Sequence, residues 1–148
     1  MRRSVVEAHE LVAGRLQAAG QLYTAGRRSL VDQMLRAGRP TTIAELLSWD
    51  QQRTQSSLYR NLADLESVNV VRRVVGLDER TRFECSEDIL GHHHHTMCGE
   101  CGIVGDFVLP SDVERLIEDA VATALATAGF APRGGRLDVT GACAECHD

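Results

Sequence analysis

The spacing of apolar residues predicts helices in the front half of the chain and short strands around one long helix in the back half. Apolar residues recur every three or four positions in segments closed by glycine, proline or asparagine, as expected for helices. Helices are expected over residues 3–19, 27–37, 42–49 and 54–68, followed by strands over 70–75 and 81–85. The back half is expected to contain strands over 102–107 and 136–140 and a helix over 111–129.

The middle of the front half has the layout of a winged helix-turn-helix. Thr42 and Glu45 form a capping-box pattern that opens a short helix, and Thr54 caps a longer one after a polar turn. In this layout the second helix enters the major groove of DNA and its first turns touch base edges. The two strands that follow form the wing, whose arginines usually contact backbone phosphates. Residues expected to contact DNA are Arg27, Arg28, Ser56, Ser57, Tyr59, Arg60, Arg72 and Arg73.

Charge divides the chain at the same place. Residues 1–83 carry 13 arginines and 9 acidic residues, whereas residues 84–148 carry 3 arginines and 12 acidic residues. The front half is therefore suited to meet an anion such as double-stranded DNA, and the back half is not. No apolar run approaches the roughly 20 residues of a membrane span. Acidic residues come too early for a secretory signal, so we expect a cytoplasmic protein with no membrane partner.

Two cysteine pairs in C-x-x-C spacing lie at the start and the end of the back half. In a reducing compartment such pairs are read as metal ligands rather than as disulfides. Two pairs complete a tetrahedral shell for zinc, and a closed shell of four sulfurs has no open position for chemistry. The spacing therefore predicts a structural Zn²⁺ site whose binding free energy stabilises the fold. Its ligands are Cys98, Cys101, Cys143 and Cys146.

A run of four histidines, His92 to His95, directly precedes the first cysteine pair. Side chains alternate between the two faces of a strand. His93 and His95 are therefore expected to face one way, and His92 and His94 the other. The imidazoles and the fifth thiol, Cys85, remain for a second, exchangeable divalent metal.

A winged helix, a histidine-rich strand running into C-x-x-C-G, a helix and a closing C-x-x-C together resemble the ferric uptake regulator family of bacterial metalloregulators. The resemblance covers roughly residues 23–146. The block from His92 to Gly102 is its most specific part, and Ser57-Leu58-Tyr59-Arg60 is similar to the recognition-helix signature of the family. The resemblance implies a metal-responsive transcriptional repressor, not an enzyme, that binds palindromic operator DNA as a homodimer. It also implies that the four paired cysteines hold structural zinc.

The sensing site is where branches of the family differ. Cys85 lies where the zinc uptake regulator branch places a thiolate, so the resemblance implies a regulatory site of Cys85, His93 and His95. Sulfur with nitrogen ligands suits zinc over manganese or iron, which makes Zn²⁺ the expected regulatory metal. Zinc-sensing relatives often have an acidic ligand where this chain has Arg72. Candidates for the fourth ligand are Glu84, Asp106, a water molecule or none.

A further family site uses the other face of the histidine strand. The resemblance implies an additional metal set of His92, His94 and an acidic residue such as Glu114. This chain departs from the pattern at Gly135, where relatives have another histidine, and Glu114 also completes a capping-box pattern with Ser111.

Other functions are less favoured by the sequence. Iron, manganese or peroxide sensing within the same family is the main alternative. A zinc store or a zinc enzyme fits less well, because the wing carries arginines and no nucleophile or base is paired with the histidines.

The expected fold class is α+β. It comprises a winged helix-turn-helix DNA-binding domain at 1–85, a hinge at 86–91, and a small dimerisation and metal-binding domain at 92–148. A sheet this small with one helix buries too little apolar surface alone, so the second domain is expected to pair with a second copy of the chain.

Overall fold

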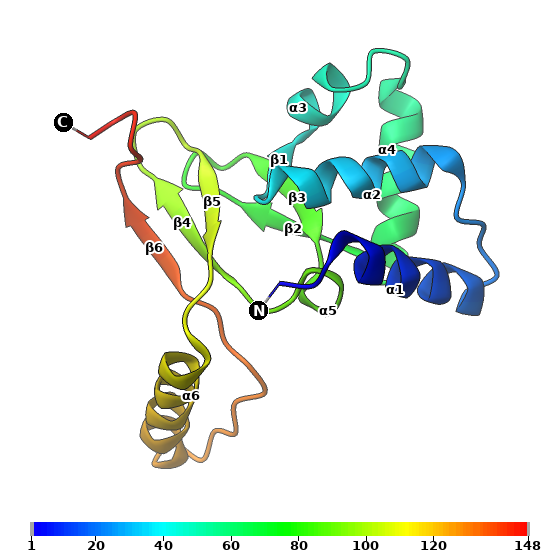
Figure 1. The fold of residues 1–148 in the computed structure, drawn as a ribbon. Helices are drawn as coiled ribbons and strands as arrows, with labels where there is room; N and C mark the ends of the chain where they lie inside the picture. Colours follow the sequence, from blue (N-terminus) through cyan, green and yellow to red (C-terminus); the bar gives the residue numbers. More distant parts are fainter. Residues whose placement is uncertain (1, 148) are drawn as a thin grey trace.

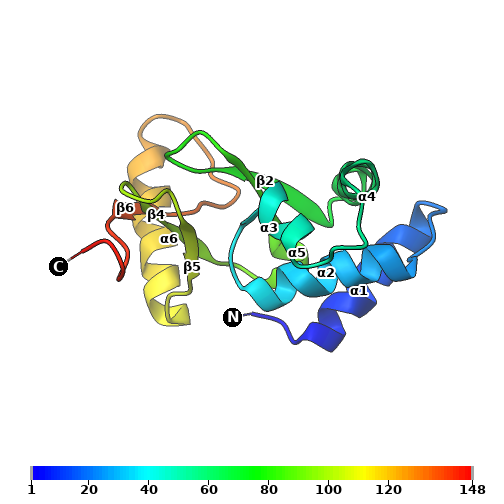
Figure 2. The same ribbon diagram turned by 90° about the horizontal axis from the view of Figure 1, so that it is seen from above.

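A computed structural model describes residues 2–147 and has the predicted α+β architecture (Figure 1). The front half contains α1 (Val5–Ala18), α2 (Ala25–Ala37), β1 (Thr41–Thr42), α3 (Ile43–Ser48), α4 (Gln55–Ser67), β2 (Val71–Val75) and β3 (Thr81–Cys85). The remainder contains α5 (Glu87–Leu90), β4 (His94–Cys98), β5 (Val104–Phe107), α6 (Ser111–Ala126) and β6 (Asp138–Gly141). Figure 2 shows α1 to α4 gathered at one end and α6 with the second sheet at the other.

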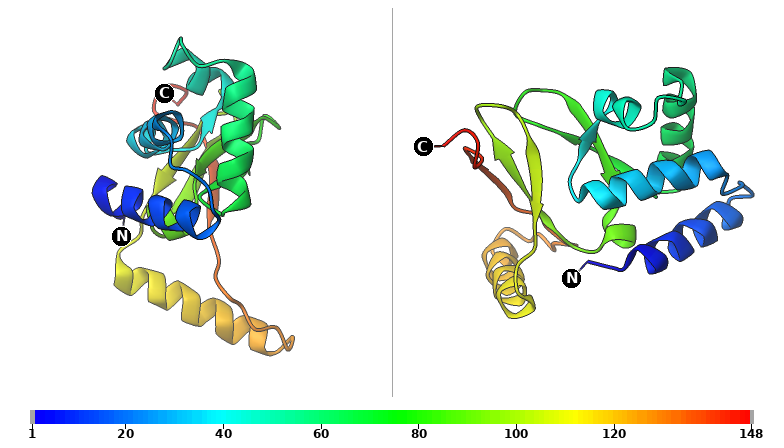
Figure 3. Two further views of the ribbon diagram at one scale, coloured as in Figure 1. Left: turned by 90° about the vertical axis from the view of Figure 1, so that its right-hand side faces the viewer. Right: turned by 45° about the horizontal axis from the view of Figure 1, so that its top comes forward.

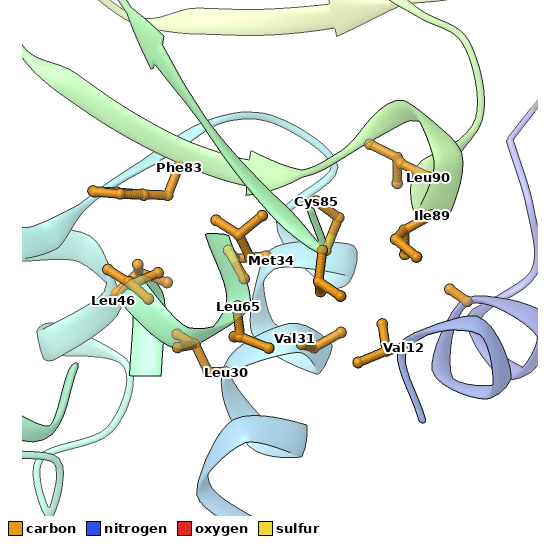
Figure 4. Close-up of a cluster of buried hydrophobic side chains, with 14 of the residues drawn as sticks. Val12, Leu30, Val31, Met34, Leu46, Leu65, Phe83, Cys85, Ile89 and Leu90 are labelled. Carbon is orange, nitrogen blue, oxygen red and sulfur yellow. The ribbon is translucent and has the colours of Figure 1, made fainter. Parts of the chain in front are cut away.

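The helices of the front half pack on a three-stranded antiparallel sheet in the order β1-β3-β2. Their apolar faces meet in one hydrophobic core, which includes Leu16, Leu30, Leu62, Leu65, Phe83 and Cys85. Figure 4 shows Cys85 inside this cluster, in the company of Met34 and Ile89. Burial of these side chains, rather than helix propensity, supplies most of the stability of such short helices.

Side-chain caps define where several helices begin. The Thr42 hydroxyl accepts a hydrogen bond from the backbone N–H of Glu45 at 3.2 Å, and the Glu45 carboxylate accepts one from the Thr42 N–H at 2.8 Å. This confirms the first predicted capping box. The second is wrong, because Ser111 is already the first residue of α6 and makes no side-chain cap. The Glu114 carboxylate binds two imidazoles instead.

The second sheet has the strand order β5-β4-β6, with β4 antiparallel to β5 and parallel to β6. His95 on the central strand is therefore flanked by Asp106 on one side and Asp138 on the other. Helix α6 projects away from both sheets (Figure 3). It has no buried residue among those described, and its apolar residues Val113 and Leu116 are exposed.

The two sheets meet where the β2–β3 hairpin lies against the β4–β5 strands. Val74 of the hairpin is buried with Met97 and Val104 of the second sheet in a separate apolar cluster. The segment expected to be a hinge contains the helical turn α5, whose Ile89 and Leu90 are part of the main core. Among the helices described for residues 2–147, none combines the length and the apolar character needed to cross a membrane.

Candidate metal centre

The four paired cysteines lie close together at one end of the second sheet. The parallel pairing of β4 with β6 places Cys98 opposite Gly141, so the chain end returns beside the first C-x-x-C turn. All four sulfurs lie within 4.8 Å of one another, and the Cys101 and Cys143 sulfurs are 3.7 Å apart. A tetrahedral ion with sulfur ligands at 2.3 Å requires sulfur–sulfur edges of about 3.8 Å. The spacing of the sulfurs therefore fits zinc and is much too long for a disulfide.

The ionisation of the four thiols also fits a cation at their centre. Backbone N–H groups of Cys101 and Cys143 lower the pKa of the Cys98 thiol to about 6. The neighbouring sulfurs of Cys143 and Cys101 raise the pKa of Cys146 to about 12. Several thiolates held this closely repel one another, so the last thiol ionises near neutral pH only when a positive charge is shared among them.

A second cluster lies at the junction of the two sheets. Glu84 comes from β3, His95 from β4, His93 from the residue just before β4, and Asp106 from β5. One ligand atom from each lies within 4.8 Å of the others. The Oε2 atom of Glu84 is 3.1 Å from the Nε2 atoms of both His93 and His95. Ligands at 2.0–2.1 Å around a tetrahedral zinc ion would be separated by about 3.3 Å.

Hydrogen bonds fix which ring nitrogen of His93 is free. Its Nδ1–H donates to the carbonyl oxygen of Gly91 at 2.9 Å, so in the neutral ring the Nε2 lone pair faces Glu84. Two electron-rich atoms in a buried site require a proton or a metal ion between them. Asp106 Oδ1 is also buried, has no hydrogen-bond partner within residues 2–147, and lies 3.6 Å from the His95 Nε2 atom. These features fit a divalent cation.

The carboxyl groups of this cluster have opposite pKa shifts. Burial raises the pKa of Glu84, but the hydrogen bonds to His93 and His95 and the nearby Arg72 charge outweigh burial and leave the pKa below its usual range. Burial dominates at Asp106, whose pKa is raised. Glu84 is therefore ionised and ready to bind a cation at neutral pH. A cation beside Asp106 would offset the effect of burial and favour its ionised form.

Cys85 does not join this cluster, which corrects the predicted ligand set. It follows Glu84 on β3, and strand alternation places its sulfur on the opposite face, in the hydrophobic core (Figure 4). Burial raises the pKa of the Cys85 thiol to about 12, so in this arrangement the group is a neutral thiol at neutral pH. Glu84 and Asp106, the two residues among the candidates for a fourth ligand, both accompany His93 and His95.

A third cluster lies on the other face of the histidine strand. His92 Nε2 is 2.6 Å from Glu114 Oε1, and His94 Nε2 is 3.0 Å from Glu114 Oε2. The backbone N–H of Leu137 donates to His94 Nδ1 at 3.0 Å, so in the neutral ring Nε2 carries the proton and donates to Glu114. The three residues of the predicted additional set thus lie together, and His94 and Glu114 satisfy each other's hydrogen bonding in this arrangement.

The residues expected to contact DNA divide into two groups. Ser56, Tyr59 and Arg60 are exposed on α4, and Arg28 is exposed with its guanidinium stacked over the Tyr23 ring. The other four have partners within the chain. Ser57 donates to the Thr54 carbonyl, Arg27 is paired with Asp64, Arg73 with Glu66, and Arg72 with Glu84. The outward face of α4 is thus the part of the predicted DNA surface that is free to bind.

Comparisons with known proteins agree with this architecture. The model of the ferric uptake regulator family matches residues 19–132. The peroxide-responsive repressor PerR of Staphylococcus aureus (strain USA300) is 26% identical over 95 residues, which are 63% of this chain and 57% of that protein. The chain therefore spans less than two thirds of the length of the curated relatives it matches.

Solved structures share the whole fold at low sequence identity. The Helicobacter pylori ferric uptake regulator Fur, described as having three functional metal binding sites, has a TM-score of 0.75 at 21% identity, covering 99% of this chain and 96% of that chain. A zinc uptake regulator complexed with zinc and DNA has a TM-score of 0.54 at 21% identity, covering 97% and 95%. Because the family model spans most of the sequence, this chain belongs to the ferric uptake regulator family.

Proposed function

We propose that this protein is a metal-responsive transcriptional repressor that binds palindromic operator DNA as a homodimer in the cytoplasm, and that it is not an enzyme. The observation that carries the proposal is the convergence of Glu84, His93, His95 and Asp106 at the junction of the two sheets. Family membership supports repressor function, and a zinc uptake regulator of the same fold has been solved with zinc and DNA.

Two sites would hold metal in this proposal. Cys98, Cys101, Cys143 and Cys146 would hold structural Zn²⁺, which supplies the charge that keeps four thiolates together. Glu84, His93, His95 and Asp106 would hold the regulatory ion. The complete hydrogen bonding of His94 argues against a third ion at His92, His94 and Glu114.

The regulatory site joins parts of the chain that must be docked together. Glu84 lies on the second wing strand, whereas His95 and Asp106 lie on the second sheet and His93 directly precedes its central strand. All four ligands meet only when the wing is docked against the second sheet, so binding favours that arrangement over any undocked one. A thousandfold change in DNA affinity would require a difference of about 4 kcal/mol between the two arrangements.

Zn²⁺ is the proposed regulatory metal, and iron or manganese sensing is the second candidate. The nitrogen–oxygen separations of 3.1–3.8 Å between the two imidazoles and the carboxylates of Glu84 and Asp106 suit a four-coordinate ion such as zinc. The second candidate is favoured by a specific observation, because the site contains two carboxylates and no sulfur.

The division into a DNA-binding domain at 1–85, a hinge at 86–91 and a dimerisation domain at 92–148 is part of the proposal. Ser56, Tyr59 and Arg60 would face the major groove from α4, with Arg28 beside them. The exposed apolar face of α6 would pair with a second copy, which would bring two recognition helices to a palindromic site.

The test compares two neighbouring histidines that face opposite ways. Duplexes are selected from a random-sequence library with zinc-loaded protein, and binding is then titrated with Zn²⁺, Mn²⁺ and, without oxygen, Fe²⁺. His93→Ala should keep one tightly bound zinc per chain but lose metal-stimulated DNA binding, whereas His92→Ala should retain it. Full metal response in His93→Ala would overturn the proposed sensing site, and the ion that acts at the lowest concentration identifies the regulatory metal.

A further inference from the structure

The two oxygens of the Glu84 carboxylate have different partners. Oε2 faces the imidazole pair, 3.1 Å from both Nε2 atoms. Oε1 accepts a hydrogen bond from the Nε of Arg72 at 2.6 Å. Glu84 is only 2% exposed, so the arginine contact fixes the orientation of a buried carboxylate.

The Asp106 carboxylate is divided in the same way. Oδ2 accepts a hydrogen bond from the Nη2 of Arg2 at 2.5 Å and lies 3.8 Å from the His93 Nε2 atom. Oδ1 lies 3.6 Å from the His95 Nε2 atom and has no hydrogen-bond partner among the described residues. Each carboxylate thus has one oxygen bound to an arginine and one oxygen near an imidazole without an arginine contact, and the arginine-bound oxygen of Asp106 also lies near His93.

Both arginines are held in place by further contacts. Arg2 belongs to the arm before α1, which lies at the junction of the two sheets (Figures 1 and 3). Its guanidinium also donates to the carbonyl of Gly38 at 3.3 Å, and the next residue, Arg3, donates its backbone N–H to Leu90 at 3.1 Å. Arg72 is fixed by the pairing of β2 with β3, where it lies opposite Glu84.

We propose that Arg2 and Arg72 determine metal specificity by holding one oxygen of each carboxylate, so that Asp106 and Glu84 each offer a single oxygen to the ion. The inference rests on the proposed sensing site. Two single oxygens and two imidazole nitrogens make four ligands, which is a complete shell for Zn²⁺. Mn²⁺ and Fe²⁺ favour six-coordinate sites rich in oxygen, for which a carboxylate that binds through both oxygens is an advantage.

The charges act in the same direction. The two guanidinium groups balance the charge of the two carboxylates. The site therefore attracts divalent ions only weakly by charge alone, and coordination geometry decides which ion binds. A purely electrostatic role for the arginines would change the affinity for all divalent ions together. A positioning role would change the ratio of the affinities for Zn²⁺ and Mn²⁺ and would also change the coordination geometry. Measuring both quantities therefore distinguishes a positioning role from an electrostatic one.

The experiment uses full-length protein with zinc in the four-cysteine site and Co²⁺ as a spectroscopic probe of the second site. Four-coordinate Co²⁺ absorbs visible light strongly, whereas six-coordinate Co²⁺ absorbs weakly. The variants are Arg2→Gln and Arg72→Gln, and the matched controls are Arg3→Gln and Arg73→Gln, which remove the same charge one position away. The affinities for Zn²⁺ and Mn²⁺ are measured separately by competition with a chelator.

The wild-type protein and both controls should give the intense four-coordinate spectrum. In Arg2→Gln and Arg72→Gln the band should weaken, and the preference for Zn²⁺ over Mn²⁺ should fall by about tenfold or more, the range found when partners of metal ligands are removed. A six-coordinate spectrum in the wild type, or an unchanged preference in both variants, would overturn the inference. Arg2 lies outside the core, so Arg2→Gln alone decides the outcome if Arg72→Gln loses its structural zinc.

His93→Ala separates this inference from the proposed function. If His93→Ala leaves the Co²⁺ spectrum unchanged, no sensing site exists at these residues and both proposals fail. If His93→Ala abolishes the spectrum while the arginine variants match the wild type, the sensing site stands and only the role of the arginines is refuted.

Discussion

Cys85 and Glu84 are neighbours on β3 whose side chains lie in different environments. Alanine at position 85 should lower stability, whereas alanine at position 84 should lower metal affinity. Cys85 is 2% exposed in the hydrophobic core, and Cys85→Ala deletes its sulfur atom. One buried methylene contributes about 0.8 kcal/mol, and the cavity that remains adds to the loss. We expect a loss of about 1–2 kcal/mol in the free energy of unfolding, with unchanged metal affinity.

Glu84→Ala should affect the metal and not the core. It removes one of four ligands and leaves the Arg72 guanidinium close to His93, where the Nη2 and Nε2 atoms are already 3.5 Å apart. Removing a partner of a metal ligand lowers affinity by about 10–100-fold, and removing a ligand itself should lower affinity by at least about 100-fold, or about 2.7 kcal/mol.

The assay combines thermal unfolding with DNA binding. For a chain of this size, 1 kcal/mol corresponds to a shift of about 2–4 °C in Tm. Cys85→Ala should melt several degrees lower and still bind DNA in response to metal, whereas Glu84→Ala should lose the response while keeping its structural zinc. If Cys85→Ala abolished the metal response with little change in Tm, the sulfur would be a ligand and the assignment of Glu84 in its place would be refuted.

Three further predictions concern other parts of the molecule. Purified protein should bind two Zn²⁺ ions per chain by elemental analysis, and His94→Ala should still bind two; a third tightly bound ion lost in His94→Ala would contradict the hydrogen bonding of that ring. Leu116→Glu, on the exposed face of α6, should give a monomer by light scattering, whereas Leu22→Glu, at a residue that is also exposed, should not; a dimer in both variants would exclude this face. The pKa of Cys85 is raised to about 12, above its value in the unfolded chain, so its contribution to stability is complete below about pH 8.5 and is lost as pH rises towards 12. As the pH rises from about 8.5 towards 12, the free energy of unfolding should therefore fall less in Cys85→Ala than in the wild type. Equal losses in the two proteins would contradict the raised pKa of this thiol.

Local patterns in the sequence were sufficient to predict the elements. The capping box at Thr42 and Glu45 and the apolar spacing of α4 depend on residues three or four positions apart, and both are found as expected. Strand alternation likewise separates His93 and His95 from His92 and His94. The four cysteines that the structure brings together were recognisable because each pair is a short motif.

The partners that complete the sites depend on tertiary contacts. Alternation puts Glu84 and Cys85 on opposite faces of β3, but which face meets the histidines is decided by how the two sheets dock. The grouping of Glu114 with His92 and His94 followed from the family resemblance and not from a local pattern, because the carboxylate meets these imidazoles across 22 and 20 positions. Arg2 reaches Asp106 across 104 positions, and no local pattern signals such a contact.

The tip of the wing is joined to the turn that carries the first cysteine pair. The buried guanidinium of Arg82 binds both carboxylate oxygens of Asp78 at 2.8 Å and the carbonyl of Gly102 at 2.7 Å. Gly102 has a φ of +78°, and a Cβ there would overlap the Asp78 carboxylate, so the contact leaves no room for a larger residue. A rotation of the front half about residues 86–91 would thus break the hydrogen bond between the buried Arg82 guanidinium and Gly102, which lies outside that segment. The wing therefore makes polar contacts with the second sheet at two places, the Glu84 cluster and the Arg82–Gly102 hydrogen bond. The second contact couples the turn of the first cysteine pair directly to the front half, without passing through residues 86–91.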